Sequence, residues 1–174
     1  MTKQEIRKHM FKLRNEMHNE EKLQQNSHIL EQIQKDHAYQ NAKVIAIFYP
    51  MGNEVDLRGL ITEEKVFVFP RIDQDGMHFY PFTDQTVFHK SKFGVMEPKG
   101  DINLDTSIDY MIAPALAISK DKIRVGYGKG YYDQFLMAHR PTKVVGVIYD
   151  FQEVNHIDMN SHDQKLDDYM KGKL

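Results

Sequence analysis

The chain contains no cysteine. That absence excludes disulfide bridges, a thiolate nucleophile and a cysteine-ligated zinc site. It is compatible with a reducing compartment, where disulfides are rare. Long apolar runs are also missing, since none approaches the ~18 residues that a membrane-spanning helix needs. Residues 1–16 carry charges throughout and lack the apolar core of a secretory signal. We therefore expect a cytoplasmic protein without membrane partners.

A strong excess of one charge is absent too. The net charge of the 174 residues is −2, which gives no reason to expect a nucleic-acid partner. Hydrophobic residues make up 41% and charged residues 28%, which is typical of a globular protein. The length predicts one domain, residues 1–174, with a sizeable core. No internal repeat, low-complexity segment or linker divides the chain.

The most distinctive stretch is glycine-rich, and it lacks the usual phosphate-binding spacings. Residues 124–133 read Arg-Val-Gly-Tyr-Gly-Lys-Gly-Tyr-Tyr-Asp. No Gly-Lys-Ser/Thr is present, and the dinucleotide fingerprint would need glycine where Tyr131 stands. Glycines at every second position permit positive φ angles, and successive N–H groups can form a concave nest for an anion. Tyr132, Phe135 and Leu136 predict that a helix follows, and a helix N-terminus suits phosphate.

Charged residues in this stretch favour a ligand site, although a simpler interpretation exists. Glycine spacing alone is equally typical of a turn between a strand and a helix. Arg124 and Lys129 add two cations, and Asp133 is a first-turn carboxylate that suits the helix dipole. Beside bound phosphates, however, a bare carboxylate would repel them. Asp133 fits there if a divalent cation lies between, as Mg²⁺ does with one or two carboxylates plus phosphates.

Helical periodicity dominates the N-terminal part of the chain. Thr2 and Glu5 form a capping box at the start of a helix. Its apolar positions share one face: Ile6, Met10, Leu13 and Met17. Three cations lie opposite, Lys3, Arg7 and Arg14, and spacing alone favours a solvated surface for them. A second helix is expected over residues 20–35, with Leu23, Leu30 and Ile33 facing inward.

Apolar runs predict strands over the following segments: 44–49, 65–70, 77–82, 109–114 and 143–149. The third lies near a sheet edge because it contains Pro81. Residues 56–61 are expected to form a short helix. A last helix is expected after a polar loop, capped by Ser161 or Asp163. Helices that alternate with buried strands predict an α/β sandwich with a largely parallel sheet flanked by helices.

The ordered string Arg-x-Gly-x-Gly-x-Gly-Tyr-Tyr-Asp resembles the signature of the 5-formyltetrahydrofolate cyclo-ligase family, also called methenyltetrahydrofolate synthetases. Further matches extend the resemblance over nearly the whole chain: Lys3-x-x-x-Arg7, Tyr49 and Glu54 around a strand end, Gly94-x-x-Glu97-Pro98, and Asp163-x-x-x-Asp167. The sequence departs from the family pattern at residues 117–123, at Lys129 and at Gln134. The resemblance implies a three-layer Rossmann-like fold.

The resemblance also implies a set of site residues. The implied catalytic residues are Arg124 and Lys129. ATP would be bound by Lys3, Gln4, Glu5, Ile6, Arg7, Arg124, Val125, Gly126, Tyr127, Gly128, Lys129, Gly130, Tyr131 and Tyr132. The folate would be bound by Tyr49, Glu54, Tyr127, Gly128, Lys129, Gly130 and Tyr131. Mg²⁺ would be held by Asp133 and Asp163. From the residues alone, Glu54 is interpreted as a surface glutamate and the 93–98 segment as core.

The activity that the resemblance implies is the ATP-dependent conversion of 5-formyltetrahydrofolate to 5,10-methenyltetrahydrofolate, with release of ADP and phosphate. Two alternatives remain open: a small-molecule kinase on the same scaffold, and a non-catalytic module that binds a folate, a nucleotide or, through its basic first helix, RNA. Whether the protein is a cyclo-ligase or a kinase, we expect its partners to be small molecules and Mg²⁺. We expect a monomer.

Overall fold

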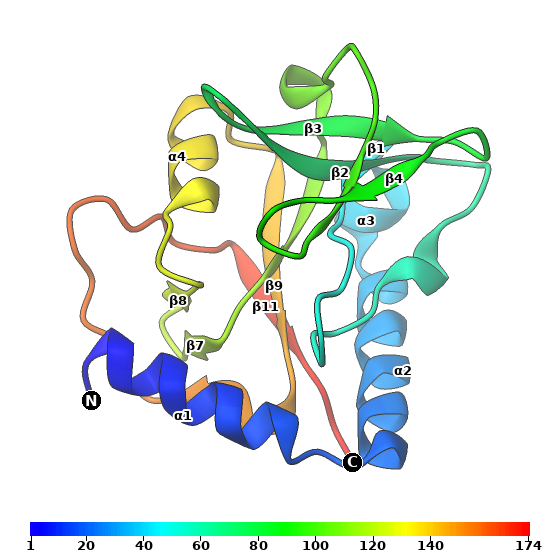
Figure 1. The fold of residues 1–174 in the computed structure, drawn as a ribbon. Helices are drawn as coiled ribbons and strands as arrows, with labels where there is room; N and C mark the ends of the chain where they lie inside the picture. Colours follow the sequence, from blue (N-terminus) through cyan, green and yellow to red (C-terminus); the bar gives the residue numbers. More distant parts are fainter.

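The structure, a computed structural model, describes residues 1–174 and is built around a six-stranded sheet (Figure 1). The strand order is β11-β9-β6-β1-β2-β3. The strands span β1 Val44–Ala46, β2 Val66–Asp73, β3 Gly76–Phe82, β6 Tyr110–Pro114, β9 Lys143–Ile148 and β11 Asp168–Lys171. All neighbouring pairs are parallel except β2 and β3, which are antiparallel. The predicted α/β fold with a largely parallel sheet is confirmed.

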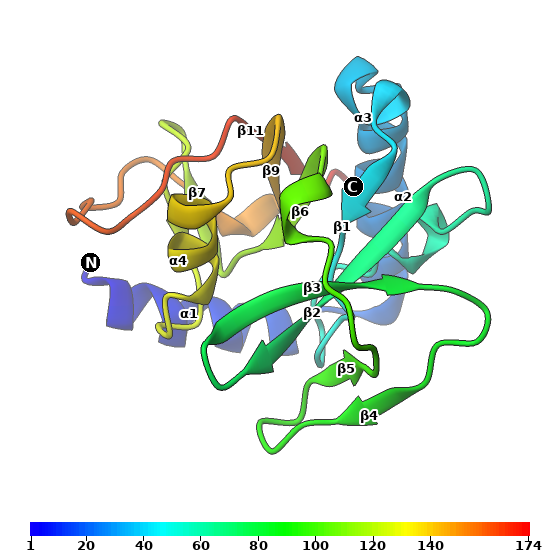
Figure 2. The ribbon, with the colours of Figure 1, turned by 90° about the horizontal axis from the view of Figure 1, so that it is seen from above.

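Alternating side chains in the central strands enter two separate cores. In β9, Val145 and Val147 pack into one core, whereas Val144 and Ile148 pack into the other. The first core is covered by α2 (Asn19–Lys35) and α3 (His37–Asn41). The second is covered by α4 (Tyr131–Ala138), so helices lie on both faces of the sheet (Figures 1 and 2). Strands that are apolar on both faces are typical of such buried parallel sheets.

A small second sheet supports the first helix. It has the order β10-β7-β8, with β7 Ala117–Ser119, β8 Arg124–Val125 and β10 Glu153–Val154. The helix α1 (Lys3–Asn15) begins after Thr2, whose hydroxyl accepts the Glu5 N–H at 3.2 Å. Ile6 and Met10 are 3% exposed and pack with Leu116, Ile123 and Val125 in a third core. This packing holds α1 beside the glycine-rich loop that follows β8.

The remaining elements are short. A two-stranded hairpin consists of β4 (Phe88–Lys90) and β5 (Met96–Pro98). Three 3₁₀ turns are present: η1 Arg58–Leu60, η2 Asp105–Ser107 and η3 Asp150–Gln152. No helix has both the length and the apolar character that a membrane span requires.

Several sequence-based boundaries need correction. The expected strand 65–70 continues to Asp73 because Arg71, Ile72 and Asp73 all pair with β3. The position of β3 at a sheet edge is confirmed. The expected short helix at 56–61 is only the 3₁₀ turn η1. The expected strand 44–49 ends as β1 at Ala46, and the following residues run on into a loop.

The predicted C-terminal helix is wrong. Residues 168–171 instead form β11, which pairs in parallel with β9 and completes the sheet. Asn160, rather than Ser161 or Asp163, caps the preceding turn, since its side-chain oxygen accepts the N–H groups of His162 and Asp163. Without residues 168–171, the backbone N–H and C=O groups on one side of β9 would have no strand to pair with. Pairing with β9 therefore stabilises these residues as a strand more than their local preference stabilises a helix.

The second helix is confirmed, and Leu30 and Ile33 face the core as expected, but the expected inward position of Leu23 is wrong. Ile29 and Ile33 are fully buried, whereas Leu23 is 68% exposed. We expect Ile33→Ala to lower the free energy of unfolding by about 2–5 kcal/mol, because it leaves a cavity in the first core. Leu23→Ala on the same helix is the matched control and should change stability by less than about 0.5 kcal/mol. Urea denaturation measures both, and equal losses would contradict the assigned helix face.

Candidate functional site

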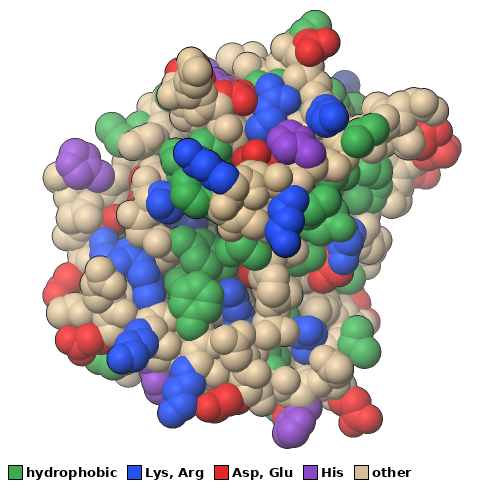
Figure 3. Space-filling view, in the orientation of Figure 1, with side chains coloured by type: hydrophobic (Ala, Val, Ile, Leu, Met, Phe, Trp, Pro, Cys, Tyr) green, Lys and Arg blue, Asp and Glu red, His purple; other side chains and the backbone are tan.

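A cavity of about 720 Å³ lies at the carboxyl ends of β1 and β6. In open α/β sheets this is where ligands bind. Phe48, Tyr49 and Pro114 line it from those strand ends, and the glycine-rich loop lines it from the opposite side. Figure 3 shows Lys and Arg side chains around a hydrophobic hollow on this face of the molecule.

The glycine-rich loop joins β8 to α4. Gly128 and Gly130 have φ angles of +96° and +73°, so both occupy the region that side chains disfavour. Gly130 is also the N-cap of α4, which brings the positive end of that helix to the cavity. Gly126 does not have a positive φ. A Cβ at this position would lie 2.6 Å from Nη2 of Arg124, so any larger residue would displace the guanidinium.

Arginine and lysine side chains surround this loop. Arg124 donates from Nε to the Pro114 carbonyl at 2.6 Å, and its guanidinium lies 4.8 Å from the Tyr132 ring centroid. Burial lowers the pKa of Arg124, although guanidinium stays charged at neutral pH. Arg7 donates from Nε to the Gly126 carbonyl at 2.8 Å. Lys129 places its ammonium 4.6 Å from the Phe93 ring centroid.

The cationic face of α1 points toward the loop, so the expectation of a solvated surface is wrong for it. Arg14 is only 4% exposed, and Lys3 and Arg7 line the cavity. The helical periodicity placed these residues on a common face correctly. It could not show that the glycine-rich loop would pack over that face, because the contact joins segments more than 100 residues apart.

Glu54 is buried at 7% exposure, which contradicts its interpretation as a surface glutamate. Its Oε1 accepts the Met51 N–H at 2.8 Å, and its Oε2 accepts the Tyr127 hydroxyl at 2.8 Å. Burial raises the pKa of Glu54, and the two hydrogen bonds and the charges of Arg14 and Arg124 partly offset that rise. The carboxylate therefore joins the loop after β1 to the glycine-rich loop.

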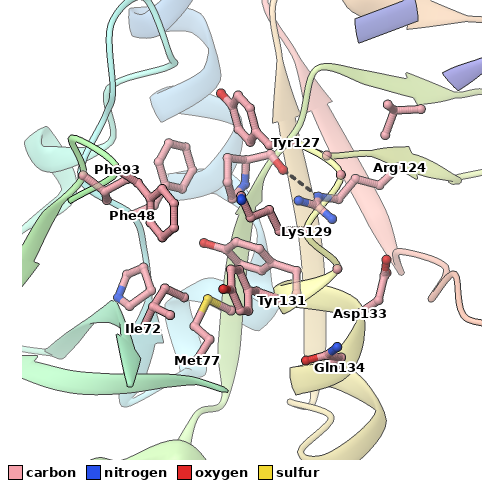
Figure 4. A pocket seen from close by; sticks show the side chains of 18 of the residues that line it. Phe48, Ile72, Met77, Phe93, Arg124, Tyr127, Lys129, Tyr131, Asp133 and Gln134 are labelled. Carbon is pink, nitrogen blue, oxygen red and sulfur yellow. Dashed lines mark hydrogen bonds between the residues drawn. The ribbon is translucent and has the colours of Figure 1, made fainter. Parts of the chain in front are cut away.

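Aromatic and apolar side chains form the wall opposite the cations. Tyr49 lines the cavity, and its hydroxyl accepts a hydrogen bond from Arg58 at 3.0 Å. Phe93, at the tip of the β4–β5 hairpin, is 50% exposed, so the expectation of core packing is wrong for it. Glu97 and Pro98 of the same segment are buried as expected. Figure 4 shows Phe48, Phe93 and Ile72 across the cavity from Arg124 and Asp133.

Two carboxylates lie beside the glycine-rich loop. Asp133 accepts the Gln164 N–H at 3.1 Å, and Asp163 accepts the Lys3 ammonium at 2.5 Å and the Asn160 N–H at 2.9 Å. No group of three or more His, Asp or Glu side chains is close enough to cage a metal ion. Two hard oxygen donors that line the same cavity as the glycine-rich loop nevertheless fit Mg²⁺ by type, since Mg²⁺ usually takes one or two carboxylates and completes its coordination with phosphate oxygens and water.

The structure brings most of the predicted site residues to one cavity. The following line it: Lys3, Arg7, Tyr49, Glu54, Arg124, Val125, Gly126, Tyr127, Gly128, Lys129, Gly130, Tyr131, Tyr132, Asp133 and Asp163. Gln4, Glu5 and Ile6 lie outside it, and Ile6 packs in the third core. Lining residues that the sequence reasoning missed include Met51, Pro70, Ile72, Met77, Met137 and Asn160. Most are apolar strand and helix residues, which no sequence signal separates from core residues.

The fold and the cavity define an α/β protein whose cavity has cationic side chains on one side and aromatic and apolar side chains on the other. The 5-formyltetrahydrofolate cyclo-ligase family model matches residues 1–171, and the chain belongs to that family. The chain is 26% identical over 170 residues to the 5-formyltetrahydrofolate cyclo-ligase of Mus musculus, which covers 87% of this chain and 84% of the relative. It is 29% identical over 117 residues to that of Mycoplasma pneumoniae, or 64% of this chain and 62% of the relative.

Solved structures of methenyltetrahydrofolate synthetases have the same fold as this chain. The NMR structure of the Aquifex aeolicus 5,10-methenyltetrahydrofolate synthetase superposes with a TM-score of 0.87 at 26% identity, covering 98% of this chain and 90% of that one. A 5,10-methenyltetrahydrofolate synthetase from Mycoplasma pneumoniae superposes with a TM-score of 0.76 at 24% identity, covering 97% and 98%. The second likeness supports the fold.

Gly128 tests the loop geometry. We expect Gly128→Val to weaken ATP binding at least tenfold, because valine disfavours φ of +96° and its Cβ would lie 3.4 Å from the Arg7 guanidinium carbon. Gly76→Val is the control, since Gly76 has φ of +132° in open space outside the cavity. Calorimetric titration of ATP into both folded variants gives the answer. Unchanged ATP affinity in Gly128→Val would contradict phosphate binding by this loop.

Proposed function

We propose that this protein converts 5-formyltetrahydrofolate to 5,10-methenyltetrahydrofolate with hydrolysis of ATP to ADP and phosphate. One observation carries the proposal. A single cavity has a cation-rich glycine loop on one side and, on the other, a buried carboxylate with an aromatic wall. The first half suits triphosphate and the second suits a reduced pterin, a flat heterocycle with N–H donors. Family membership supports the same activity.

The reaction has a clear chemical requirement. The formyl oxygen of the substrate is a poor leaving group, so direct ring closure by the neighbouring N10 is slow. Transfer of the γ-phosphoryl group to that oxygen gives an activated imidate phosphate. N10 then attacks the formyl carbon and loses its proton to solvent, the carbon–oxygen bond breaks, and the oxygen leaves as phosphate. In phosphoryl transfer of this kind, the protein mainly positions the reacting groups and neutralises their charge.

The loop residues supply that charge neutralisation in the proposal. Arg124 and Lys129 act on the transferring phosphoryl group, and the N–H groups of the loop and of the α4 N-terminus bind the phosphate oxygens. Lys3 and Arg7 approach the same loop from α1. Arg124 is fixed by its bond to Pro114, so its orientation costs little reorganisation when charge develops.

The folate lies across the cavity in the proposal. Glu54 accepts hydrogen bonds from pterin N–H groups with the lone pairs that Met51 and Tyr127 leave free. Tyr49, Tyr127 and Tyr131 contact the ring faces. No side chain needs to act as a covalent nucleophile.

Mg²⁺ would be held by Asp133 and Asp163, and when bound it would neutralise phosphate charge. Lys3 holds Asp163 in place through the 2.5 Å ion pair, and Gln164 does the same for Asp133 through its N–H. A cytoplasmic location and a monomeric state remain predictions from the sequence.

One assay separates this activity from the two alternatives. Protein, ATP, Mg²⁺ and 5-formyltetrahydrofolate are mixed, methenyltetrahydrofolate is followed by its near-ultraviolet absorbance, and phosphate is measured. The cyclo-ligase forms methenyl product and free phosphate in equal amounts. A kinase would give a stable phosphorylated product, and a binding module would leave ATP intact.

Glu54→Gln should weaken folate binding by about 10- to 100-fold, because charged hydrogen bonds contribute roughly 1.5–3 kcal/mol. ATP affinity measured without folate should hold, since the phosphates lie on the other side of the cavity. Asp105→Asn is a control for the loss of a buried carboxylate, since Asp105 is 5% exposed and does not line the cavity. Separate calorimetric titrations of each ligand measure the effect. Unaltered folate binding would show that the folate lies elsewhere.

Asp133→Asn should raise the Mg²⁺ concentration needed for half-maximal turnover, because a charged oxygen donor is lost. Calorimetric titration of Mg²⁺ with ATP present should show the same weakening, independently of turnover. Gln134→Ala on the same helix is the control for loss of a neutral side chain, because Gln134 also lines the cavity but is exposed and carries no charge. An unchanged Mg²⁺ requirement would restrict Asp133 to favouring the helix dipole and bonding Gln164.

A further inference from the structure

Three segments of the chain are joined by consecutive hydrogen bonds along the wall of the cavity. Arg14 of α1 donates from Nη2 to the Tyr127 hydroxyl at 3.0 Å. That hydroxyl, in the glycine-rich loop, donates to Glu54 Oε2 at 2.8 Å. The other oxygen of Glu54 accepts the N–H of Met51, in the loop after β1, at 2.8 Å. The chain of bonds therefore connects the phosphate side of the cavity to its folate side.

The direction of these bonds is fixed by the chemistry of the groups. Arginine can only donate, and an ionised carboxylate can only accept. The hydroxyl of Tyr127 must therefore accept from Arg14 and give its one hydrogen to Glu54. Burial raises the pKa of Tyr127, which keeps that hydroxyl protonated. A tyrosine hydroxyl that accepts one hydrogen bond and donates another is fixed in its orientation.

Arg14 is an unusual residue for a purely structural role. It is 4% exposed, its Nε is buried without a hydrogen-bond partner, and it is not among the residues that line the cavity. Its guanidinium lies 5.3 Å from the Phe11 ring centroid and 5.9 Å from that of Tyr127. Burial of a charge is costly, and an apolar side chain of similar size is often at least as stabilising. The buried cation of Arg14 lies near the opposite charge of Glu54 and donates a hydrogen bond to Tyr127, so it can hold both side chains in position.

We propose that Arg14 is a positioning residue that couples the two halves of the site: through Tyr127 and Glu54, nucleotide binding at the glycine-rich loop orders the loop after β1 and strengthens folate binding. The inference rests on the proposed function, whose two ligands it connects. Tyr127 stands between Gly126 and Gly128, so any ligand that fixes this loop fixes the tyrosine. Glu54 is then held by the bond from the Tyr127 hydroxyl to its Oε2. Met51 is held in turn, because its N–H donates to Oε1 of the same carboxylate.

The charge of Arg14 also favours folate binding through the ionisation of Glu54. Burial raises the pKa of Glu54, and the nearby charge of Arg14 opposes that rise. Without Arg14 a larger fraction of Glu54 is protonated, and a protonated carboxyl loses acceptor capacity for pterin N–H groups. Coupling between the ligands is reciprocal, so folate must strengthen nucleotide binding by the same factor.

Hydrogen exchange tests the connection without any folate. The amide of Met51 exchanges only when its bond to Glu54 opens, so its protection reports on the loop after β1. Addition of ATP and Mg²⁺ should slow exchange at Met51 in the unaltered protein and should not do so in Tyr127→Phe, which lacks only the hydroxyl. The same slowing in both proteins, or slowing in neither, would overturn the proposal.

Ligand titration measures the coupling itself. The dissociation constant of 5-formyltetrahydrofolate is determined with and without a non-hydrolysable ATP analogue, and the ratio is expected to be about 5- to 150-fold in the unaltered protein. Tyr127→Phe and Arg14→Met should bring that ratio close to one, whereas Arg14→Lys should retain part of it. A ratio near one in the unaltered protein, or an unchanged ratio in Tyr127→Phe, would overturn the proposal.

Tyr110→Phe is the matched control. The Tyr110 hydroxyl also donates to a carboxylate, Asp36 at 2.9 Å, in a fully buried position outside the cavity. It should reduce stability and leave the ratio unchanged, which separates coupling from a general loss of folding. If the unaltered protein neither binds nor converts 5-formyltetrahydrofolate, the proposed function fails, while the exchange of Met51 still decides the connection.

Discussion

The packing of α1 on the small sheet is the contact on which the rest of the site depends. Ile6 and Met10 are nearly fully buried against Leu116, Ile123 and Val125. Because apolar burial fixes the rotation of the helix, the side chains three residues before each of these contacts, Lys3 and Arg7, are also fixed in direction. Arg7 then reaches Gly126, and Lys3 reaches Asp163. An ordinary hydrophobic contact thus gathers cations from residues 3–14 around a loop at residues 126–130.

The cavity combines two environments that a single surface could not provide. The whole chain has a net charge of −2, yet one side of the cavity gathers Lys3, Arg7, Arg124 and Lys129. Local concentration of charge in a concave site with apolar walls strengthens its attraction for phosphate. On the other side, burial makes Glu54 sensitive to its neighbours, and Tyr127 lies between the two environments. Transfer of a phosphoryl group from a triphosphate to a group on a pterin needs both environments within one cavity.

Local rules predicted the elements well where the signal was local. The capping of α1 by Thr2, the apolar runs of the central strands and the helix after Gly130 all follow from short-range preferences. These local rules failed where contacts with distant segments decide the structure. Residues 168–171 became a strand because β9 offers a free edge, and Leu23 stays in solvent because the second helix turns Ile29 and Ile33 to the sheet. Neither outcome is encoded within the segment itself.

The amino-acid sequence by itself determined the α/β class, the glycine-rich and cation-bearing character of residues 124–133 and, through the ordered glycine signature, the family. These features depend on residue type and spacing along a few turns of chain. The tertiary structure alone decided that Arg14 is buried, that Glu54 bonds Tyr127, and that Ile72, Met77 and Phe93 form a cavity wall. A side chain's burial depends on what packs over it, and here the covering segments lie far away along the chain.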